Sequence, residues 1–554
     1  MADATTVFEL AANAASNVGD RLTEQAARTP DKILLTTESR SISYAKLDEL
    51  SNAYAAGFQR IGITKHDVVC QMLPNCEAFV VNWLALAKLG AVQAPINPEF
   101  TGAALLRLLN LTEATVLVLD SSLQASVAAI AGELEHLEQI VLRGSTESAL
   151  EPALSKFSLS NLDVLDIAGS GPPGVTVSYA DPLMLLFTSG TTGASKAVEI
   201  SHRYALHYAA EYIEHWEITA DDVMYTAYPL FHVDASVSTF LVALHCGCRA
   251  VVMSRFSVSR FWDDIRNFGG TITTFMGAVA TFLYERAPNP NDAHNSLRLA
   301  LVAPVPAFWR EFEIRFGIKV VAGYGSTEAC FPCWGSPHEP HRDDTFGKPC
   351  EHWELRIGDS HDEALPVNMT GEILVRPKRP YTMMTGYYKN PAATAETWRN
   401  LWHHSGDLGF LDEDGSLHFI GRLKDAIRRR GENISAFEVE EVLDGHPDVL
   451  ETAVIGVPSE YTEEDVKVVV VLRGNVGCSA GDIISWAKGR LPRYALPRYV
   501  EFMDELPTTE TSKVRKHELR DAWRNAQTFD LERGQYLSDR PLRASNPIGC
   551  MNTE

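Results

Sequence analysis

The sequence predicts an α/β protein with a large N-terminal domain, made of two α/β layers and a β-rich subdomain, and a small α+β C-terminal domain. Three observations support this fold class. Strand and helix patterns alternate in two separate stretches, which favours parallel sheets covered by helices. Residues 358–422 change to short strands bounded by turn residues. A further alternation of strands and helices after residue 422 indicates a separate compact unit.

The two long alternations define the two expected layers. In the first, Gly90 follows an apolar helix pattern and is expected to end it. The expected elements of the first layer are strand 68–73, helix 77–89, strand 92–96, helix 102–111 and strand 115–119. Those of the second layer are strands 223–227 and 250–253, helix 256–268, strand 271–275, helix 278–286, strand 299–302, helix 308–316 and strand 320–322.

Changes in composition indicate where the domains divide. Residues 169–174 contain two prolines and three glycines, which predicts a linker between subdomains. After residue 422, Ser435 and Glu438 have the spacing of a capping box at a helix start. We expect an N-terminal domain at 1–422, a C-terminal domain at 423–528, and a loosely ordered or partner-packed tail at 529–554.

Bulk composition excludes several classes of protein. The chain has 554 residues, too many for one ordinary core. Its 72 acidic residues outnumber 49 basic ones, so a broad footprint for nucleic acid is missing. Nine scattered cysteines argue for a reducing compartment. Neither a secretory signal nor an apolar run of about 20 residues is present, so we expect a cytoplasmic protein without a membrane span. The oligomeric state stays open, with a homodimer as one option.

The segment from Thr188 to Lys196 predicts a grip on phosphate. It reads Thr-Ser-Gly-Thr-Thr-Gly-Ala-Ser-Lys and directly follows the apolar strand pattern 183–187. Small hydroxyl residues and glycines let backbone N–H groups close around phosphate oxygens, and Lys196 adds a positive charge. The spacing differs from that of P-loop NTPases, because Gly190 and Gly193 are too close together. We expect a nucleoside triphosphate ligand. Taken alone, the segment is also compatible with a surface turn.

Five further segments accompany this loop, and each alone can be a turn, a cap or a solvated charge. They are 323–328 (Gly-Tyr-Gly-Ser-Thr-Glu), 405–409 (Ser-Gly-Asp-Leu-Gly), 421–425 (Gly-Arg-Leu-Lys-Asp), 431–435 (Gly-Glu-Asn-Ile-Ser) and 507–513 (Pro-Thr-Thr-Glu-Thr-Ser-Lys). In this order, over roughly residues 20–525, the six motifs resemble those of the adenylate-forming superfamily. That superfamily includes acyl- and aryl-CoA synthetases, firefly luciferase and the adenylation domains of peptide synthetases.

The resemblance implies an ATP site with Mg²⁺. Thr188 and Glu328 match the positions that hold the metal, and oxygen ligands suit such a hard cation. The adenine would lie along the segment from Gly323 to Ser326, and Thr327 would approach the α-phosphate. The matching ATP or AMP positions are Thr188, Ser189, Gly190, Thr191, Thr192, Gly193 and Lys196 for the phosphates, Gly323, Tyr324, Gly325 and Ser326 for the adenine, and Asp407 and Arg422 for the ribose.

The resemblance also implies a mobile C-terminal domain. Lys513 matches a lysine that enters the site and places a positive charge where the carboxylate attacks the α-phosphate. Lys424 matches the hinge about which the domain would turn, on a microsecond to millisecond scale. Coenzyme A would meet Gly431, Glu432 and Asn433, and Arg428 in a basic cluster is a candidate for its phosphates.

Four positions depart from the usual pattern of the superfamily. Ser195 stands for proline and Ala197 for glycine, so we expect a less rigid phosphate loop. Ser405 replaces threonine and keeps a hydroxyl group. Ser512 replaces the glycine before Lys513 and would be strained, by about 1 kcal/mol or more, if that position needs a positive φ. None of these changes removes a charged catalytic group.

The acyl pocket is assigned by the same resemblance. The wording Phe-His-Val-Asp at 231–234 is most similar to the crotonobetaine/carnitine–CoA ligase branch, with His232 as a candidate gate. The carboxylate of Asp234 suits a cationic acid beside an aromatic wall. A core position for His232 and a helix cap for Asp234 are the structural alternatives. The candidate wall residues are His232, Val233, Asp234, Met276, Gly277, Ala303, Pro304, Cys330 and Phe331.

The implied function is an ATP-dependent carboxylic acid–CoA ligase that works through an acyl-adenylate and releases AMP and pyrophosphate. Fatty, aryl and small branched acids stay open as substrates. No segment bearing a phosphopantetheine serine is apparent after the small domain, which disfavours a peptide synthetase module. The alternatives are an acyl-AMP ligase that delivers to a carrier protein, a luciferase-like enzyme, and a non-catalytic nucleotide-binding relative.

Overall fold

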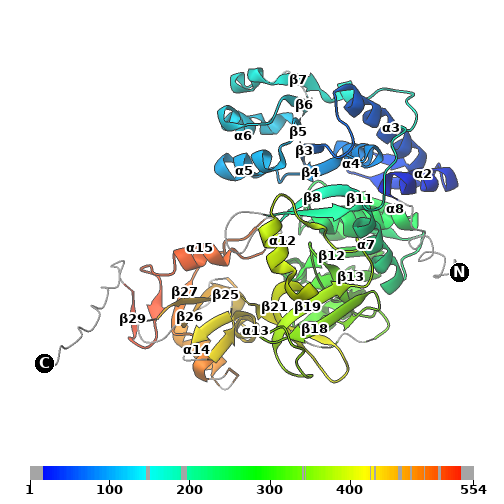
Figure 1. Ribbon diagram of the computed structural model, residues 1–554. Helices are drawn as coiled ribbons and strands as arrows, with labels where there is room; N and C mark the ends of the chain where they lie inside the picture. Colours follow the sequence, from blue (N-terminus) through cyan, green and yellow to red (C-terminus); the bar gives the residue numbers. More distant parts are fainter. Residues whose placement is uncertain are drawn as a thin grey trace. The chain divides into compact units, whose positions relative to one another are not determined.

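The computed structural model describes residues 17–144, 150–188, 196–339, 342, 345–423, 426–429, 432–459, 464–474, 477–488, 490–491, 493–509 and 513–537. The chain forms two compact units (Figure 1). The first comprises Met1–Ser405 and Phe410–His418, and the second comprises Gly406–Gly409 and Phe419–Glu554. The last passage between them lies close to the predicted boundary after residue 422.

The first unit contains an eight-stranded sheet in the order β20-β9-β8-β4-β3-β5-β6-β7. The strands from β8 to β7 pair in parallel, whereas β8, β9 and β20 pair antiparallel and form one edge. The bounds are β3 (Val68–Met72), β4 (Val92–Pro95), β5 (Val116–Asp120), β6 (Gln139–Arg143), β7 (Ser158–Asn161), β8 (Pro182–Thr188), β9 (Lys196–Ser201) and β20 (Gly386–Tyr387). In Figure 1, α3 (Tyr44–Arg60) and α4 (Glu77–Leu89) cover one face, and α5 (Gly102–Thr112) and α6 (Gln124–Ala128) cover the other.

A seven-stranded sheet in the order β14-β13-β12-β10-β11-β1-β2 forms the second layer. All its neighbouring strands are parallel except β1 and β2. Its strands are β1 (Ile33–Thr36), β2 (Ser41–Ser43), β10 (Val223–Thr226), β11 (Arg249–Val252), β12 (Ile272–Met276), β13 (Leu299–Ala303) and β14 (Lys319–Val321). Its helices are α9 (Phe261–Phe268), α10 (Gly277–Tyr284) and α11 (Trp309–Phe316). The prediction of two α/β layers is confirmed.

Apolar helices fill the space between the two sheets. Helix α4 packs on β4 and α3, while α8 (Val242–Cys246) packs on β11, α7 (His202–His215) and α2 (Val18–Arg28). An eight-residue π-helix, Asp234–Leu241, runs directly into α8. The sequence pattern gave no sign of this π-helix, because its buried residues continue the apolar run of the following helix.

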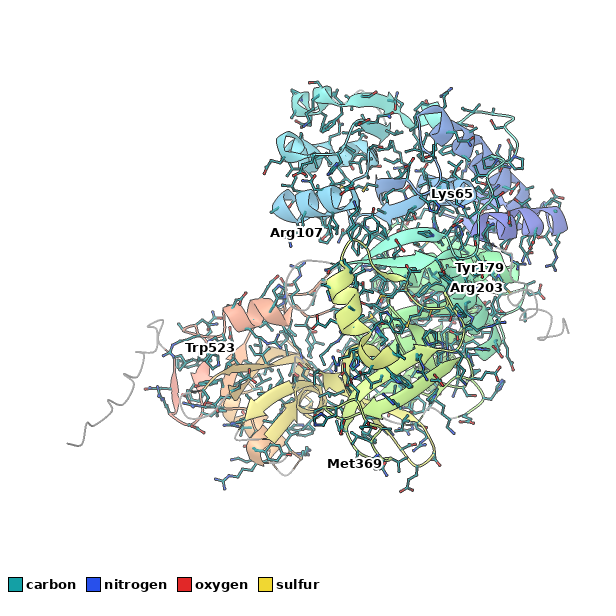
Figure 2. The ribbon with its side chains drawn as sticks, in the orientation of Figure 1. Lys65, Arg107, Tyr179, Arg203, Met369 and Trp523 are labelled. Carbon is teal, nitrogen blue, oxygen red and sulfur yellow. The ribbon has the colours of Figure 1, made fainter. Side chains whose placement is uncertain are left out.

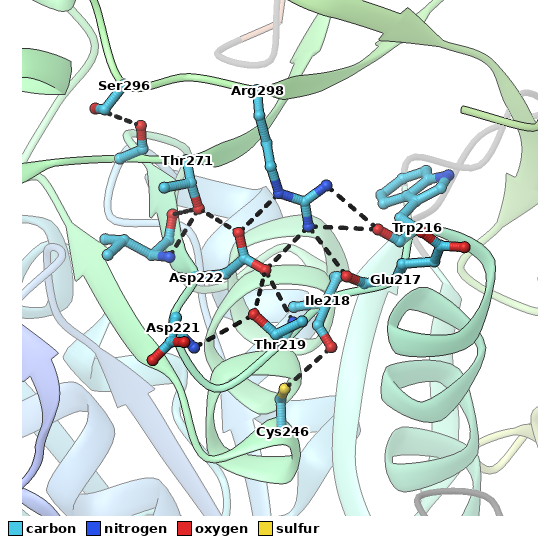
Figure 3. A network of polar contacts seen from close by, with 12 residues as sticks. Trp216, Glu217, Ile218, Thr219, Asp221, Asp222, Cys246, Thr271, Ser296 and Arg298 are labelled. Atoms are coloured by element: carbon cyan, nitrogen blue, oxygen red, sulfur yellow. Dashed lines mark hydrogen bonds and ion pairs between the residues drawn. The ribbon is translucent and has the colours of Figure 1, made fainter. Parts of the chain in front are cut away.

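The amino ends of three central strands are tied together by one buried carboxylate. Asp222, just before β10, accepts hydrogen bonds from Thr271 Oγ1 at 2.8 Å and from Arg298 Nε at 2.8 Å and Nη2 at 2.9 Å. Thr271 precedes β12 and Arg298 precedes β13, so the network (Figure 3) aligns the starts of all three strands. Their carboxyl ends then lie together at the opposite edge, where ligands bind in sheets of this kind.

The segment that follows the predicted linker is held in place by charged side chains of the first unit. Lys65 Nζ lies 2.7 Å from Asp181 Oδ2 and donates to the Thr176 carbonyl. The Arg203 guanidinium lies 3.4 Å from the ring centroid of Tyr179, and Figure 2 shows these two side chains next to each other. These contacts fix the segment that enters β8 and so the position of Thr188.

The β-rich part of the first unit contains two smaller sheets. One has the order β15-β16-β17, with β15 (Gly323–Ser326), β16 (Cys330–Trp334) and β17 (Lys348–Pro349). The other has the order β18-β19-β21-β22, with β18 (Trp353–Gly358), β19 (Gly371–Pro377), β21 (His403–Leu411) and β22 (Leu417–Arg422), and α12 (Pro391–Thr397) lies between β20 and β21 in the chain. Strands β21 and β22 carry residues of both units. This arrangement agrees with the predicted β-rich subdomain.

The second unit is built on the sheet β25-β26-β27-β28-β29. Helices α13 (Ala436–Asp444) and α14 (Ala480–Ala487) pack on one face and α15 (Lys516–Asp521) on the other (Figure 1). Its strands are β23 (Ala426–Arg429), β24 (Glu432–Ser435), β25 (Val449–Pro458), β26 (Glu464–Leu472), β27 (Tyr499–Phe502), β28 (Phe529–Asp530) and β29 (Gln535–Tyr536).

The predicted tail is part of this sheet as far as the structure describes it. Asp530 is fully buried, and its carboxylate lies 3.1 Å from Arg498 Nη2. Arg498 also lies 2.8 Å from Asp465 Oδ2. Residues 529–537 are therefore ordered by buried ion pairs that the scattered composition of the segment did not reveal. The rest of the tail lies outside the described residues. None of the described helices is both long and apolar enough to cross a membrane.

We predict that Asp222→Asn lowers the free energy of unfolding by about 2 kcal/mol at neutral pH, because hydrogen bonds to a charged acceptor are lost. Burial alone would raise the pKa of Asp222, but hydrogen bonds from Arg298, the Thr219 N–H and Thr271 outweigh it and lower the pKa. The wild type should therefore have the higher free energy of unfolding at neutral pH, and this difference should disappear as the pH falls through the lowered pKa of Asp222. Urea unfolding at several pH values measures it.

The neighbouring exposed Asp221 provides a matched control. Asp221→Asn should change the unfolding free energy by no more than about 0.5 kcal/mol. Equal effects of the two substitutions would contradict the assigned role of Asp222.

Candidate active site

One predicted phosphate contact, Lys196, meets the predicted metal ligand Glu328 through a tyrosine. The Lys196 ammonium lies 4.4 Å from the ring centroid of Tyr387. The hydroxyl of Tyr387 donates to Glu328 Oε1 at 3.0 Å. Thr188 pairs with Lys196 across β8 and β9. Three predicted site residues from distant parts of the sequence are thereby brought together.

The turn that carries Thr327 and Glu328 is fixed from two sides. The buried Tyr204 hydroxyl, on α7, donates to the Thr327 carbonyl at 2.7 Å. The Met384 N–H donates to the Glu328 carbonyl at 2.9 Å. Thr188 and Glu328 are partly exposed, so their oxygen atoms are accessible to a ligand. Two accessible oxygen donors of this kind fit a Mg²⁺ ion.

The predicted adenine segment forms a tight hairpin with β16. A Cβ atom on Gly325 would lie 2.0 Å from the Cys330 carbonyl oxygen, and one on Gly323 would lie 2.6 Å from the ring of Phe331. These glycines are thus required by the packing of the hairpin itself. Tyr324 is buried. The hairpin packing thus accounts for both glycines within the structure itself, and the adenine contact that the resemblance implies stays a prediction.

Two of the departures from the usual motifs have clear structural outcomes. Ala197 is buried in the core of the first sheet, pairs with Phe187, and accepts a hydrogen bond from the Tyr388 N–H. Ala197 therefore belongs to a paired strand, and the expectation of a less rigid loop stays a prediction, because Ser189–Ser195 lie outside the described residues. Ser405 keeps the function of a hydroxyl group, since its Oγ donates to the Ile373 carbonyl at 2.6 Å.

The predicted wall residues gather at the carboxyl ends of β12 and β13. Met276 and Ala303 are paired in register, and a Cβ atom on Gly277 would lie 2.5 Å from the Pro304 carbonyl oxygen. Asp234 joins them because Thr274 Oγ1, on β12, lies 2.7 and 2.6 Å from its two carboxylate oxygens. The ring of Phe331 packs against Tyr208 and Tyr212 of α7.

Asp234 supplies the one carboxyl group among these wall residues, and its pKa is perturbed. Dense surroundings raise its pKa from 3.8 to about 6, against the opposing hydrogen bond from Thr274. Its charge in turn helps to raise the pKa of the Tyr212 hydroxyl, after burial. Within the described residues Asp234 has no ion-pair partner, yet it is partly exposed. A carboxylate placed in this way can attract a cation.

The structure decides between the alternatives for two residues of this wall. The helix that contains Asp234 begins after Val233 without a side-chain cap, so the cap alternative is not supported. His232 is partly exposed, and its ring packs on Phe231 at 4.6 Å. Its carbonyl accepts hydrogen bonds from the Ser236 N–H and Oγ, which fix its backbone. A fully buried core histidine is therefore excluded.

In the second unit, Asp407 and Arg422 lie side by side. Asp407 is buried, and its Oδ1 lies 2.9 Å from Arg422 Nε. The preceding Gly406 has a φ of 71°, a conformation that favours glycine and explains why this motif contains it. The half-exposed guanidinium of Arg422 and the carboxylate thus offer donors and acceptors at one place.

Lys513 lies on a narrow turn of the same unit. Its carbonyl accepts from the Thr509 N–H at 2.8 Å, and its own N–H donates to Thr509 Oγ1 at 3.1 Å. Thr508 and Val514 form an antiparallel bridge at the base. The side chain of Lys513 is exposed. These contacts fix the backbone of Lys513 and leave its side chain at the surface.

The predicted CoA residues lie on the hairpin of β23 and β24, where Arg428 pairs with Asn433 and Arg429 pairs with Glu432. The neighbouring Arg429 is buried, with Nε 3.0 Å from Asp465 Oδ1. It therefore has a structural role, and only part of the basic cluster can serve a ligand. The side chains of Arg428, Glu432 and Asn433, and residues Ser189–Ser195, Lys424, Gly431 and Ser512, lie outside the described residues.

Sequence reasoning missed three residues that complete the site. Tyr387 links Lys196 to Glu328, Thr274 binds Asp234, and the Tyr228 hydroxyl accepts from the Met276 N–H at 2.8 Å. Each is one aromatic or hydroxyl residue without a motif of its own. For Tyr387 the sequence offers one signal, its position directly after Gly386. That signal does not indicate that the tyrosine contacts Lys196 or Glu328.

Comparisons with known proteins agree with this architecture. The family described as AMP-binding enzyme matches residues 22–388, and the AMP-binding enzyme C-terminal domain matches residues 438–513. A crotonobetaine/carnitine–CoA ligase of Salmonella arizonae is 30% identical over 502 residues, which cover 88% of this chain and 96% of that protein. The protein of the same description from Salmonella typhi is 29% identical over 521 residues, with the same coverage of both chains.

Solved structures show the same fold. ATP-bound MatB from Rhodopseudomonas palustris has a TM-score of 0.82 and 25% identity, over 92% of this chain and 99% of that one. An anthranilate CoA ligase, AuaEII, in complex with anthranoyl-AMP has a TM-score of 0.83 at 24% identity, over 92% and 97% of the two chains. The predicted fold class is confirmed, with a large N-terminal and a smaller C-terminal domain.

We predict that Asp234→Asn stabilises the protein by about 2 kcal/mol at pH 7, after allowance for partial exposure. The raised folded-state pKa means that the wild type loses stability as the pH rises from about 4 to 6, whereas the variant does not. The two proteins should therefore unfold alike near pH 4. Thermal unfolding across this range measures the difference, and a variant less stable than the wild type at pH 7 would contradict it.

Proposed function

The chain belongs to the AMP-binding enzyme family, and from this premise we propose that the protein ligates a carboxylic acid to coenzyme A with ATP, through an acyl-adenylate. The observation that carries the proposal is the meeting of Lys196 and Glu328 at Tyr387. This meeting places a positive charge and a carboxylate beside the strand ends that flank the predicted phosphate loop.

The proposed chemistry has two steps. The acid's carboxylate oxygen attacks the α-phosphorus of ATP, the bond to the bridging oxygen breaks, and pyrophosphate leaves. The thiol of coenzyme A then attacks the acyl carbonyl carbon of the mixed anhydride, a C–S bond forms, and AMP leaves while the thiol proton passes to solvent. Both steps develop negative charge, so positioned positive charges and hydrogen-bond donors supply most of the catalysis.

Each unit would contribute its own groups to the first step. In the first unit, Thr188 and Lys196 would contact the phosphates, and Glu328 with Thr188 would hold Mg²⁺, which offsets phosphate charge when bound. In the second unit, Asp407 and Arg422 would hold the ribose, and Lys513 would neutralise charge between the carboxylate and the α-phosphate. Rotation about Lys424 between the two steps stays a prediction.

We further propose that the acid carries a positive charge. Asp234 is the support, because it combines partial exposure and the lack of a described ion-pair partner with a pKa near neutrality. The ring of Tyr212, whose hydroxyl lies within the field of Asp234, belongs to an aromatic cluster with Phe331. A quaternary ammonium group fits such surroundings, since aromatic faces and a carboxylate both attract it. The names of the Salmonella relatives agree with this class.

We predict that the purified protein with ATP, Mg²⁺ and coenzyme A forms thioesters from crotonobetaine or carnitine faster than from neutral acids of similar size. Pyrophosphate release and mass spectrometry of the products measure this. Asp234→Asn should reduce kcat/KM for the cationic acid by about tenfold or more and leave the neutral acid unaffected. Below about pH 6 the wild type should lose the same preference, because its carboxylate becomes protonated.

Other outcomes of this assay would redirect the proposal. A preference for benzoate, anthranilate or a fatty acid would reject the cationic class but keep the ligase. Adenylate without thioester would indicate a carrier-directed or luciferase-like enzyme. Silence with all acids, in a protein that binds ATP, would support a non-catalytic relative.

We predict that Lys513→Ala separates the two steps. Formation of the adenylate should fall by about a hundredfold or more, because a positive charge on the developing transition state is lost. Thioester formation from supplied acyl-AMP should change little, because that step does not use this charge. Single-turnover kinetics measure both steps. The exposed Lys488 of the same unit provides the control, and Lys488→Ala should alter neither.

A further inference from the structure

The register of strands β9 and β20 places Tyr387 next to Lys196. It lies opposite Val198 in the antiparallel pair of β20 and β9. Lys196 precedes Val198 by two residues, so both side chains lie on the same face of β9 as the ring of Tyr387. The diagonal contact between Tyr387 and Lys196 thus follows from the register. The first layer and the β-rich part of the first unit meet at this pair.

The two ends of the Tyr387 side chain hold two different charges. Its ring face lies under the Lys196 ammonium, at 4.4 Å from the centroid, which is an attractive cation–π geometry. Its hydroxyl donates to Glu328 Oε1 at 3.0 Å, a hydrogen bond to a charged acceptor. The residue itself is 9% exposed, so its own side chain is largely shielded from bulk water, whereas Lys196 and Glu328 are partly exposed.

These contacts affect whether Lys196 and Glu328 stay available to bind ligands. An ammonium and a carboxylate that contact the two ends of one side chain attract each other, and a direct ion pair would occupy both groups. Tyr387 gives each group a neutral partner instead. The backbone of Glu328 is held by Met384, only three residues before Tyr387, which fixes the starting point of the side chain that carries the carboxylate.

We propose that Tyr387 is a positioning residue that holds the Lys196 ammonium on its ring and the Glu328 carboxylate on its hydroxyl, and so keeps both charges separately available to phosphate and metal. The inference rests on the proposed function, because it assigns these two charges to ATP and Mg²⁺. The tyrosine hydroxyl would orient Glu328, which holds the metal, and the tyrosine ring would orient Lys196, which contacts the phosphates.

We predict that Tyr387→Phe weakens the effect of Mg²⁺ on ATP binding. The full-length protein is titrated with ATP by calorimetry, without any acid, once with Mg²⁺ and once with EDTA. The gain in ATP affinity that Mg²⁺ causes should be about tenfold smaller in the variant, because Glu328 loses its hydrogen bond. Affinity in EDTA should stay unchanged, because the ring remains under Lys196. Tyr387→Leu should also lose affinity in EDTA, by about fivefold.

Tyr388 is the matched control. It is the next residue, its ring packs against the core of the first sheet, and its N–H bond to Ala197 survives substitution. Tyr388→Phe should leave both affinities unchanged. A merely structural role for Tyr387 would shift melting temperature and both affinities together, whereas positioning shifts only the Mg²⁺-dependent part in Tyr387→Phe. Equal Mg²⁺ responses in Tyr387→Phe and Tyr388→Phe would overturn the inference.

The assay separates this inference from the proposed function. If the wild type binds ATP in a Mg²⁺-dependent manner but activates no acid, the ligase proposal fails and the Tyr387 inference is still tested by the same titration. If acids are activated and the two tyrosine variants behave alike, the inference fails and the ligase proposal stands. In an active protein, Tyr387→Phe should raise the half-saturating Mg²⁺ concentration and leave KM for the acid unchanged.

Discussion

The antiparallel pairing of β9 with β20 is the interaction on which the candidate site depends. Strand β9 begins at Lys196, and β20 contributes Tyr387 from a segment almost two hundred residues later in the sequence. This pair forms the edge of the first sheet. Through the hydroxyl of Tyr387 it also contacts Glu328, which lies between β15 and β16 in the β-rich part of the first unit. Parallel strands alone would leave these groups on separate elements, since each strand end carries its own loop.

Buried carboxylates of the first and second units differ in the donors that surround them. Asp222 accepts hydrogen bonds from Thr219, Thr271 and Arg298, which lower its pKa despite its burial. Asp465 and Asp530 each form a buried ion pair with Arg498. Asp234 has one neutral donor among the described residues and a raised pKa. A raised carboxyl pKa is common at functional sites, which supports the proposal that Asp234 binds a cationic acid.

Much of the fold could be predicted from the sequence, because strand and helix periodicities are local. Helix α4 has the bounds that the apolar pattern gave, Glu77–Leu89, and the strands of both layers fall within a few residues of expectation. Two features were not predictable in this way. The helix expected at 256–268 begins only at Phe261, and residues 529–537 join a sheet through long-range ion pairs. Both depend on tertiary partners that no local pattern specifies.

In the candidate site, too, some residues can be predicted from local sequence and others only from tertiary contacts. Charged residues in motifs, such as Lys196, Glu328 and Asp407, could be predicted as site residues because their chemistry is distinctive and their spacing resembles that of known motifs. The residues that orient them are neutral and common, and their roles come from register and distance. Tyr387 differs from Tyr388 in nothing that a sequence pattern can detect, yet strand pairing directs one ring to Lys196 and the other to the core. Because a pleated strand alternates its faces, one position along the chain decides whether a tyrosine orients a charge or fills a core.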